Sequence, residues 1–362
     1  INKIKEDHKP DILIAVTSTS FSMRGEISLI DKFDKTKILL ENGIDIVLEL
    51  PFTYAIQSAD FFAQNAIKIL NDIGVTDIIF GSETTNISLY NKIYPLLNEI
   101  NYENNNLSKK NNFKLLLEKN KFENDEIKII ESPNFTLGMQ YIKFIKDNNL
   151  KINYHLLQRI SNNYHDKIIT SNIASATAIR TSYKNNLDVN NLIPYDKSRF
   201  VDIKKSEDNL FNIIKYNYVV NNNYIKTDFL ANEGIQNYIR NNGDFNSDYY
   251  SFIDQLKNKK YTISTISRSI LHNLLETSSI NNLEIEYIRI LGINKIGLEH
   301  IKSLDKSIKN KIFSNPNELK FKEQTIINEI LNYELKATSL YGVITNKNIL
   351  INEYKLPIRK DN

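Results

Sequence analysis

The first 160 residues alternate between short apolar runs and segments with helical periodicity, and this alternation constrains the fold more than any other feature. The apolar runs cover residues 11–16, 45–50, 77–80 and 151–157. The helical segments between them cover residues 31–40, 58–73 and 87–119. Each apolar run is short enough to be a strand that is buried on both faces. Strands separated by helices predict an α/β protein with a doubly wound parallel sheet.

The second half of the chain has a different pattern, because the alternation stops after Pro194. Amphipathic helices are expected over residues 208–218, 248–256, 263–275, 283–291 and 325–340. With 362 residues, the chain also exceeds the length of one typical domain. We therefore predict an α/β domain over residues 1–195 and a mainly helical domain over residues 196–362.

Composition excludes several classes of site. The chain has no cysteine, and its five histidines show no pairing at metal-ligand spacing, so no metal site is predicted. The sequence contains no run of about 18 apolar residues and no leader with a basic and then an apolar segment. We expect no association with a membrane and a cytoplasmic location.

The beginning of the chain is informative about the first structural unit. Residues 1–8 resemble the end of a helix, and Lys9-Pro10 separates them from the first apolar run. In a βαβ unit a strand comes before such a helix. We therefore expect the sequence to begin part-way through its first unit.

A candidate anion site lies in the segment Ser175-Ala-Thr-Ala-Ile-Arg180. Small hydroxyl residues followed by a helix-forming run indicate a helix start, where unpaired backbone N–H groups and the helix dipole favour an anion. Only eight of the 46 basic residues are arginine, so an arginine here points to bidentate recognition. The alternative interpretation is a surface helix with an ordinary N-cap and a solvated Arg180.

A basic segment in the second half is a candidate nucleic-acid contact. Lys259, Lys260 and Arg268 lie close to Tyr261 near a predicted helix start. Such residues are suited to phosphodiester contacts. The net charge of +3 is too small to prove a nucleic-acid partner, and a solvated helix face is the alternative.

The chain resembles the tRNA(Met) cytidine acetate ligase family, a branch of the HxGH nucleotidyltransferase superfamily. The resemblance rests on motifs spread over nearly the whole chain. These motifs are residues 21–26 with 31–33, 49–60, 80–83, 132–134 with 137–138, 158–159 with 164–166, 175–180, 260–262, 287–292 and 336–342. The resemblance implies a nucleotidyltransferase-like Rossmann domain that binds ATP, followed by a domain that binds tRNA.

The resemblance also implies a reaction. Acetate would be activated by ATP to acetyl-adenylate with release of pyrophosphate. The acetyl group would then be transferred to N4 of the wobble cytidine of elongator tRNA(Met). The resemblance leaves open whether Mg²⁺ accompanies the ATP, since this ion often binds through substrate phosphates with few protein ligands.

Site residues follow from the matched motifs. The implied ATP-binding residues are Gly81, Asn134, Arg159, Ser175, Thr177 and Arg180. In this assignment Gly81 lets backbone approach the adenosine and Asn134 hydrogen-bonds it, while Arg159, Arg180 and the helix start hold the phosphates. The tRNA-binding candidates are the basic cluster Lys259, Lys260 and Arg268, which is predicted from the clustering of its charges. No catalytic residue is assigned, because the HxGH segment is expected to lie before Ile1.

Two other functions are compatible with parts of the pattern. One is an adenylyltransferase of the same superfamily that makes a dinucleotide cofactor, but the large helical domain with its basic segment argues against it. The other is a tRNA-binding homologue with impaired catalysis, which the absent HxGH segment favours. The replacement of the family's usual Gly-Asn by Thr19-Ser20 favours it too. The oligomeric state is not predicted.

Overall fold

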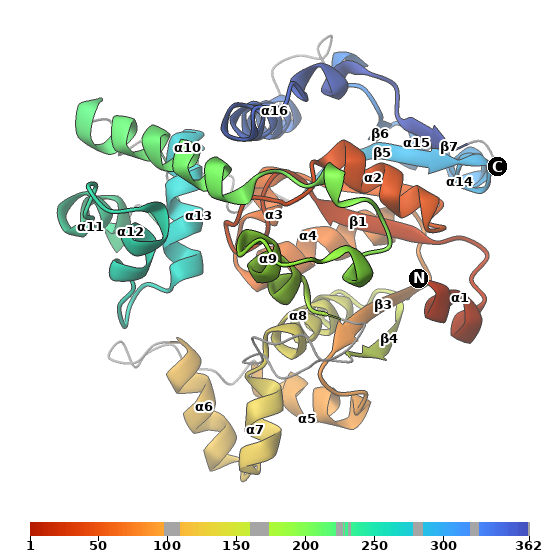
Figure 1. The fold of residues 1–362 in the computed structure, drawn as a ribbon. Helices are drawn as coiled ribbons and strands as arrows, with labels where there is room; N and C mark the ends of the chain where they lie inside the picture. Colours follow the sequence, from red (N-terminus) through yellow and green to blue (C-terminus); the bar gives the residue numbers. More distant parts are fainter. Residues whose placement is uncertain are drawn as a thin grey trace. The chain divides into compact units, whose positions relative to one another are not determined.

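The computed structural model describes residues 1–97, 109–159, 174–221, 227, 229–230, 233–277, 285–318 and 326–360, with the side chains of 109–112 left out. The chain divides into two compact units, each described here by itself (Figure 1). Unit 1 comprises residues 1–57, 162–257 and 261–362. Unit 2 comprises residues 58–161 and 258–260.

A mixed sheet forms the centre of unit 1. Strand β1 (Ile14–Ser18) runs parallel to β2 (Ile46–Leu50), and β2 runs antiparallel to β5 (Ile288–Asn294). The short strands β6 (Ile312–Phe313) and β7 (Ile358–Lys360) both pair with β5 in parallel. All residues of β2 and β5 are buried, so the middle of this sheet is also the core of the unit.

Strand β5 corrects the prediction of a helix over residues 283–291. All seven residues of the strand are buried, and the Ile residues among them suit a strand buried on both faces. A Cβ added at Gly292 would lie 2.4 Å from the Thr36 methyl group, so this glycine lets a helix pack closely on the strand. Pairing with β2 therefore overrides a local pattern that is compatible with a helix.

Helices make up most of the remaining part of unit 1. Their bounds are α1 (Asn2–His8), α2 (Lys32–Glu41), α3 (Phe52–Ala55), α9 (Ala176–Lys184), α10 (Ile203–Lys215), the π-helix η3 (Tyr216–Val220), α11 (Ile235–Asn242), α12 (Tyr249–Gln255), α13 (Ile263–Leu274), α14 (Lys295–Ser303), α15 (Lys306–Lys309) and α16 (Ile326–Thr345). Figure 1 shows α10, α11, α12 and α13 gathered into one helical group. The helices predicted over residues 208–218, 248–256, 263–275 and 325–340 are confirmed, with small differences at their ends.

Five charged side chains form a buried charge cluster inside unit 1. The cluster consists of Lys32, Glu49, Arg289, Glu334 and Glu353. The Lys32 amine contacts all three carboxylates, and the Arg289 guanidinium contacts Glu49 and Glu353. The backbone N–H of Phe52 donates to Glu334 Oε2 at 2.7 Å, so the cluster also satisfies the first turn of α3.

Unit 2 is a layer of helices on a two-stranded parallel sheet. Strands β3 (Asp77–Ser82) and β4 (Asn153–Gln158) pair in parallel over their full lengths. The helices are α4 (Ala59–Asp72), α5 (Ile87–Leu97), α6 (Lys109–Lys119), α7 (Asn124–Ile130) and α8 (Pro133–Asp147). A Cβ added at Gly138 would lie 2.3 Å from Phe80 Cε2, so Gly138 is what allows α8 to lie directly on β3.

The α/β class is confirmed, and so are the four predicted strands in the first 160 residues. The three strands β5, β6 and β7, which the sequence pattern does not predict, come from the part predicted to be mainly helical. The division at residue 195 follows the change in sequence pattern, whereas the two units follow contacts between residues, so that boundary stays a prediction.

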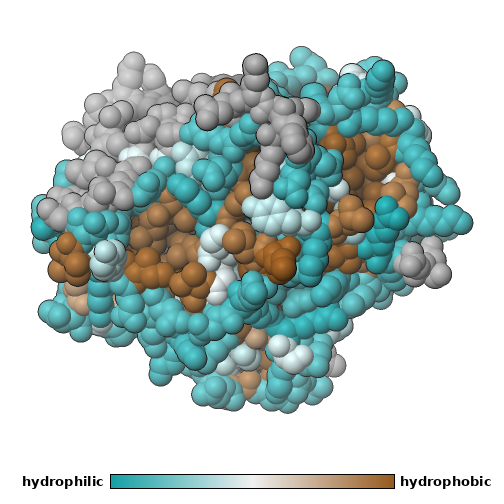
Figure 2. All heavy atoms as spheres, turned by 90° about the horizontal axis from the view of Figure 1, so that it is seen from above, coloured by the Kyte–Doolittle hydropathy of each residue, from teal (hydrophilic) through white to brown (hydrophobic). Residues whose placement is uncertain are grey.

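The surface is mixed in character. On the face drawn in Figure 2, apolar residues occur in groups that hydrophilic residues separate. Exposed apolar side chains of unit 1 include Val220, Tyr250 and Leu356. Among the described residues, no helix has both the length and the apolar character needed to cross a membrane.

Candidate functional site

The carboxyl ends of β3 and β4 bring one group of the predicted site residues together. Strand register places Gly81 opposite Leu157, and the backbone N–H of Arg159 donates to the Ser82 carbonyl at 2.9 Å. A Cβ added at Gly81 would lie 3.3 Å from Arg159 Cγ, so the glycine leaves room for the arginine stem to cross the strand end. The carboxyl ends of parallel strands are where open α/β sheets bind ligands.

Glu83, just after β3, holds the start of α8. Its Oε2 accepts hydrogen bonds from Ser132 Oγ at 2.7 Å and from the Phe135 backbone N–H at 2.9 Å. A carboxylate at a helix N-terminus satisfies N–H groups that lack partners in the helix and interacts favourably with the helix dipole. Burial raises the pKa of Glu83, but hydrogen bonds from Asn134, Ser132 and the backbone outweigh it and keep the pKa below its usual value.

Asn134 lies between Glu83 and Arg159. Its Nδ2 donates to Glu83 Oε1 at 2.6 Å, and its Oδ1 accepts from Arg159 Nη1 at 3.4 Å. The structure therefore brings together Gly81, Asn134 and Arg159, three of the six residues predicted to bind ATP. It adds Glu83, which the sequence pattern marks only as part of a motif.

The other three predicted residues lie on α9 in unit 1. Ser175 is the N-cap of this helix, and its Oγ accepts from the Ala178 backbone N–H at 3.1 Å, so the predicted helix start is confirmed. Thr177 is exposed in the first turn. Residues 160–173, which include the Tyr164, His165 and Asp166 of the matched motifs, lie outside the described residues.

Arg180 is attached to the loop that follows β1. Its Nη2 donates to the Ile27 carbonyl at 2.7 Å, and its Nε lies 3.8 Å from Glu26 Oε2. The side chain is 21% exposed, so the guanidinium is neither fully solvated nor fully buried. The alternative of a solvated arginine on a surface helix is therefore an incomplete description of Arg180.

Two further cations bind the same loop. Lys35 Nζ donates to the Ser18 carbonyl at 2.8 Å, and Arg268 Nη1 donates to the Met23 carbonyl at 3.2 Å. Burial lowers the pKa of Lys35 to about 8. The negative charge of Asp31 raises this pKa, and the positive charge of Arg180 lowers it. Cations from α2, α9 and α13 thus gather around residues 18–27. Lys35 is missed by the sequence reasoning, although the polar loop after an apolar run is a signal for this region.

The predicted tRNA contacts divide between the two units. Lys259 and Lys260 are exposed and belong to unit 2, whereas Arg268 belongs to unit 1, so each group is described alone. Arg268 serves at least partly to hold the loop at Met23. The assignment of these three residues to tRNA binding stays a prediction.

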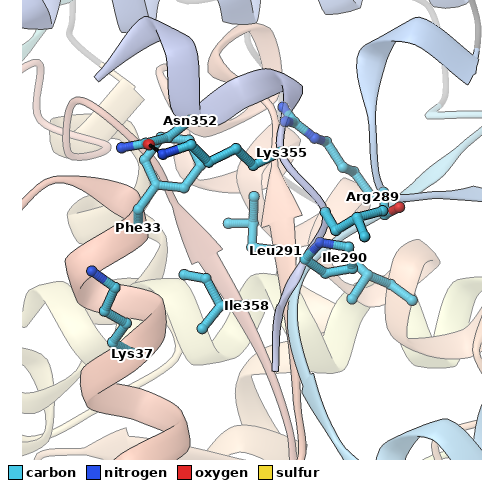
Figure 3. Close-up of a pocket in the computed structure, with 11 residues that line it drawn as sticks. Phe33, Lys37, Arg289, Ile290, Leu291, Asn352, Lys355 and Ile358 are labelled. Atoms are coloured by element: carbon cyan, nitrogen blue, oxygen red, sulfur yellow. Dashed lines mark hydrogen bonds between the residues drawn. The ribbon is translucent and has the colours of Figure 1, made fainter. Parts of the chain in front are cut away.

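A separate pocket lies in unit 1 (Figure 3). Its volume is about 160 Å³, and its lining includes Phe33, Lys37, Leu291, Lys355 and Ile358. Sites for drug-sized ligands usually measure about 300–1,000 Å³. None of the residues predicted to bind ATP or tRNA lines this pocket, so it is distinct from the predicted site.

The acidic and histidine residues that the structure describes form no group of three or more that could hold a metal ion. The group at the ends of β3 and β4 instead offers hydrogen-bond donors, an amide and a guanidinium. Such groups can form hydrogen bonds with a nucleotide.

Comparisons with known proteins identify the family of the chain. The model of the HIGH Nucleotidyl Transferase family matches residues 1–355. A tRNA(Met) cytidine acetate ligase from Thermosipho africanus (strain TCF52B) is 32% identical over 373 residues, which span 94% of this chain and 86% of that protein. The ligase of the same name from Caldicellulosiruptor saccharolyticus is 30% identical over 374 residues, which span 95% and 89%.

A solved structure matches over the same extent. Crystalline Thermotoga maritima TmcAL bound with alpha-thio ATP has a TM-score of 0.80 and 26% identity, covering 100% of this chain and 95% of that chain. The chain therefore belongs to the HIGH nucleotidyl transferases and, within them, to the tRNA(Met) cytidine acetate ligase family. Membership of this family makes the chain an enzyme of the ligase class.

Proposed function

We propose that the protein uses ATP to activate acetate and transfers the acetyl group to N4 of the wobble cytidine of elongator tRNA(Met). Support comes from the names of its relatives and from the ATP analogue bound to the Thermotoga maritima protein. The observation that carries the proposal is the convergence of Gly81, Asn134 and Arg159 at the ends of β3 and β4.

The proposed reaction has two steps. A carboxylate oxygen of acetate attacks the α-phosphorus of ATP, the bond from this phosphorus to the β-phosphate breaks, and pyrophosphate leaves. The cytidine N4 then attacks the acetyl carbon, AMP leaves with the bonding electron pair, and N4 loses a proton. Both steps depend mainly on positioning and on cations that neutralise the phosphates.

Each predicted residue has a role in this scheme. Asn134 and the backbone at Gly81 bind the adenosine, and Arg159 binds phosphate. Ser175, Thr177 and Arg180 form the phosphate-binding part contributed by α9. A Mg²⁺ ion accompanying the ATP would bind through the phosphates. Lys259, Lys260 and Arg268 contact the tRNA backbone.

The experiment is pyrophosphate exchange into ATP, measured with the protein expressed from its complete coding sequence. Exchange that requires acetate and needs no tRNA is the expected result, and Arg159→Ala should lower it. Arg359→Ala is the matched control, because Arg359 is exposed on β7. An absence of exchange, with tRNA binding retained, would support the alternative of a tRNA-binding homologue without catalysis.

A further inference from the structure

We propose that Glu83 makes the nucleotide site selective for adenine, by fixing which end of the Asn134 amide faces the ligand. The inference rests on the proposed function, because it assumes that Asn134 contacts the purine. Glu83 is a positioning residue: it orients the Asn134 side chain and does not contact the ligand itself.

The first step is that both Glu83 carboxylate oxygens are already engaged. Oε2 accepts from Ser132 and from the Phe135 backbone, and Oε1 accepts from Asn134 Nδ2. The main chain at this residue is fixed as well, since Gln158 Nε2 donates to the Glu83 carbonyl at 3.0 Å. An ionised carboxylate can only accept hydrogen bonds, so the amide nitrogen of Asn134 must face it.

The second step concerns the other end of the amide. Arg159 Nη1 lies 3.4 Å from Asn134 Oδ1, and a guanidinium can only donate. A reversed amide would place its oxygen against the Glu83 carboxylate and its NH₂ against the Arg159 N–H groups. Two unfavourable contacts would replace two favourable ones, so Oδ1 is the end left for other partners.

The third step is the chemistry of the ligand. A carbonyl oxygen has two acceptor positions, and the contact with Arg159 is long, so Oδ1 can accept from a donor on the bound purine. The 6-amino group of adenine is such a donor. A purine with a 6-oxo group, such as hypoxanthine, would set two acceptors against each other and leave a polar group without a partner.

Two variants test this inference. In Glu83→Gln the amide oxygen can still accept from Ser132 and Phe135, but the amide nitrogen then faces Asn134. We expect Asn134 to turn its oxygen toward Gln and its NH₂ toward the ligand, at the cost of its contact with Arg159. In the double variant Glu83→Gln with Asn134→Asp, the glutamine at position 83 donates to the new carboxylate at position 134. The second oxygen of that carboxylate again accepts from the ligand.

The measurement is the ratio of affinities for ATP and inosine triphosphate, by calorimetry, for each variant. The natural protein should prefer ATP by about tenfold or more, the scale of one mismatched hydrogen bond. Glu83→Gln should lower this ratio by about tenfold, and the double variant should restore it to within about threefold. Glu118→Gln, an exposed carboxylate on α6, is the matched control and should leave the ratio unchanged.

An unchanged ratio in Glu83→Gln, with both affinities lowered equally, would overturn the inference and leave Glu83 with only a structural role. Failure of the double variant to restore the ratio, while thermal unfolding shows that it is folded, would overturn it as well. The binding measurement is separate from catalysis. A lack of acetate-dependent exchange in the natural protein would therefore count against the proposed function alone.

Discussion

Lys32 and Glu334 are separated by 302 positions in the sequence and form a buried ion pair with an Nζ to Oε1 distance of 2.8 Å. Both side chains are 0% exposed. The contact ties α2, near the start of the chain, to α16, near its end. Glu49 and Glu353 also contact Lys32, so removal of this one amine affects three carboxylates.

We expect Lys32→Met to destabilise the protein strongly. Arg289 would be the remaining cation of the cluster, with three buried carboxylates around it. Removing one partner of a buried ion pair lowers the free energy of unfolding by about 3–5 kcal/mol. Urea unfolding would measure the loss. Lys37→Met on the same helix is the control, because Lys37 is 50% exposed and should change stability by less than about 0.5 kcal/mol. Equal stability of the two variants would contradict the importance of the cluster.

His272 should make stability depend on pH in weak acid. Its Nε2 is hydrogen-bonded to the Ile56 carbonyl at 2.7 Å and its Nδ1 to Thr277 Oγ1 at 2.8 Å, in a fully buried position. Burial lowers the pKa of His272 from 6.5 to about 4. The unfolded chain therefore binds a proton more readily between these values, so stability is fully present above pH 6.5 and is lost as the pH falls toward 4.

The expected loss is about 3 kcal/mol across this window. Urea unfolding of the natural protein and of His272→Gln at pH 7 and pH 5 provides the measurement. The variant starts less stable at pH 7 but should lose less between the two values. His8→Gln, at an exposed position on α1, should follow the natural protein. Parallel curves for all three proteins would show that His272 is not the group that titrates.

Two glycines of unit 2 should respond differently to alanine. The Cβ of Gly138→Ala would lie 2.3 Å from the Phe80 ring, so helix α8 or this packed ring must move, and we expect a cost of about 1–3 kcal/mol in thermal unfolding. At Gly81 the nearest atom is Arg159 Cγ at 3.3 Å, on a side chain that can shift. Gly81→Ala should keep its stability and raise the KM for ATP. The reverse pattern would show that Arg159 is not positioned across Gly81.

Arg180→Lys should weaken the use of ATP. Lysine keeps the charge but loses the planar fork, and with it the hydrogen bond to the Ile27 carbonyl. We expect a loss on the order of 1–3 kcal/mol in kcat/KM for ATP, the scale of one charged hydrogen bond. Steady-state kinetics of pyrophosphate exchange would measure it. Unchanged affinity and turnover would remove Arg180 from the site.

Replacement of Lys259, Lys260 and Arg268 by alanine should weaken tRNA binding and flatten its dependence on salt. Each lost phosphate contact should change the slope by roughly 0.7–0.9 log units. Because Arg268 also holds Met23, the double variant of the two lysines should be compared with Arg268→Ala. The double variant should retain acetate-dependent exchange without tRNA. A salt slope that does not move would place the RNA contacts elsewhere.

The sequence predicts those parts of the fold whose cause is local. Short apolar runs identify β1 to β4, and the preference of Ser and Thr for helix starts identifies the N-cap at Ser175. Strand β5 is missed because its residues also fit an amphipathic helix, and its pairing partner β2 lies far away in the sequence. Long-range pairing of this kind leaves no local signal.

The candidate site likewise contains residues that the sequence predicts and residues that it does not. The family motifs identify Gly81, Asn134 and Arg159, which the structure brings together. The roles of Glu83 and Lys35 depend on distant partners, Asn134 in one case and the carbonyl of Ser18 in the other, and spacing alone does not reveal them. The charge cluster around Lys32 is hidden for the same reason.

The most direct test of the proposed function is incorporation of radiolabelled acetate into purified elongator tRNA(Met), with ATP and the protein expressed from its complete coding sequence. We predict acid-stable label that requires ATP and disappears when the wobble cytidine is replaced by uridine. Label that is equal in the uridine transcript, or an absence of label despite acetate-dependent pyrophosphate exchange, would contradict transfer to the wobble cytidine.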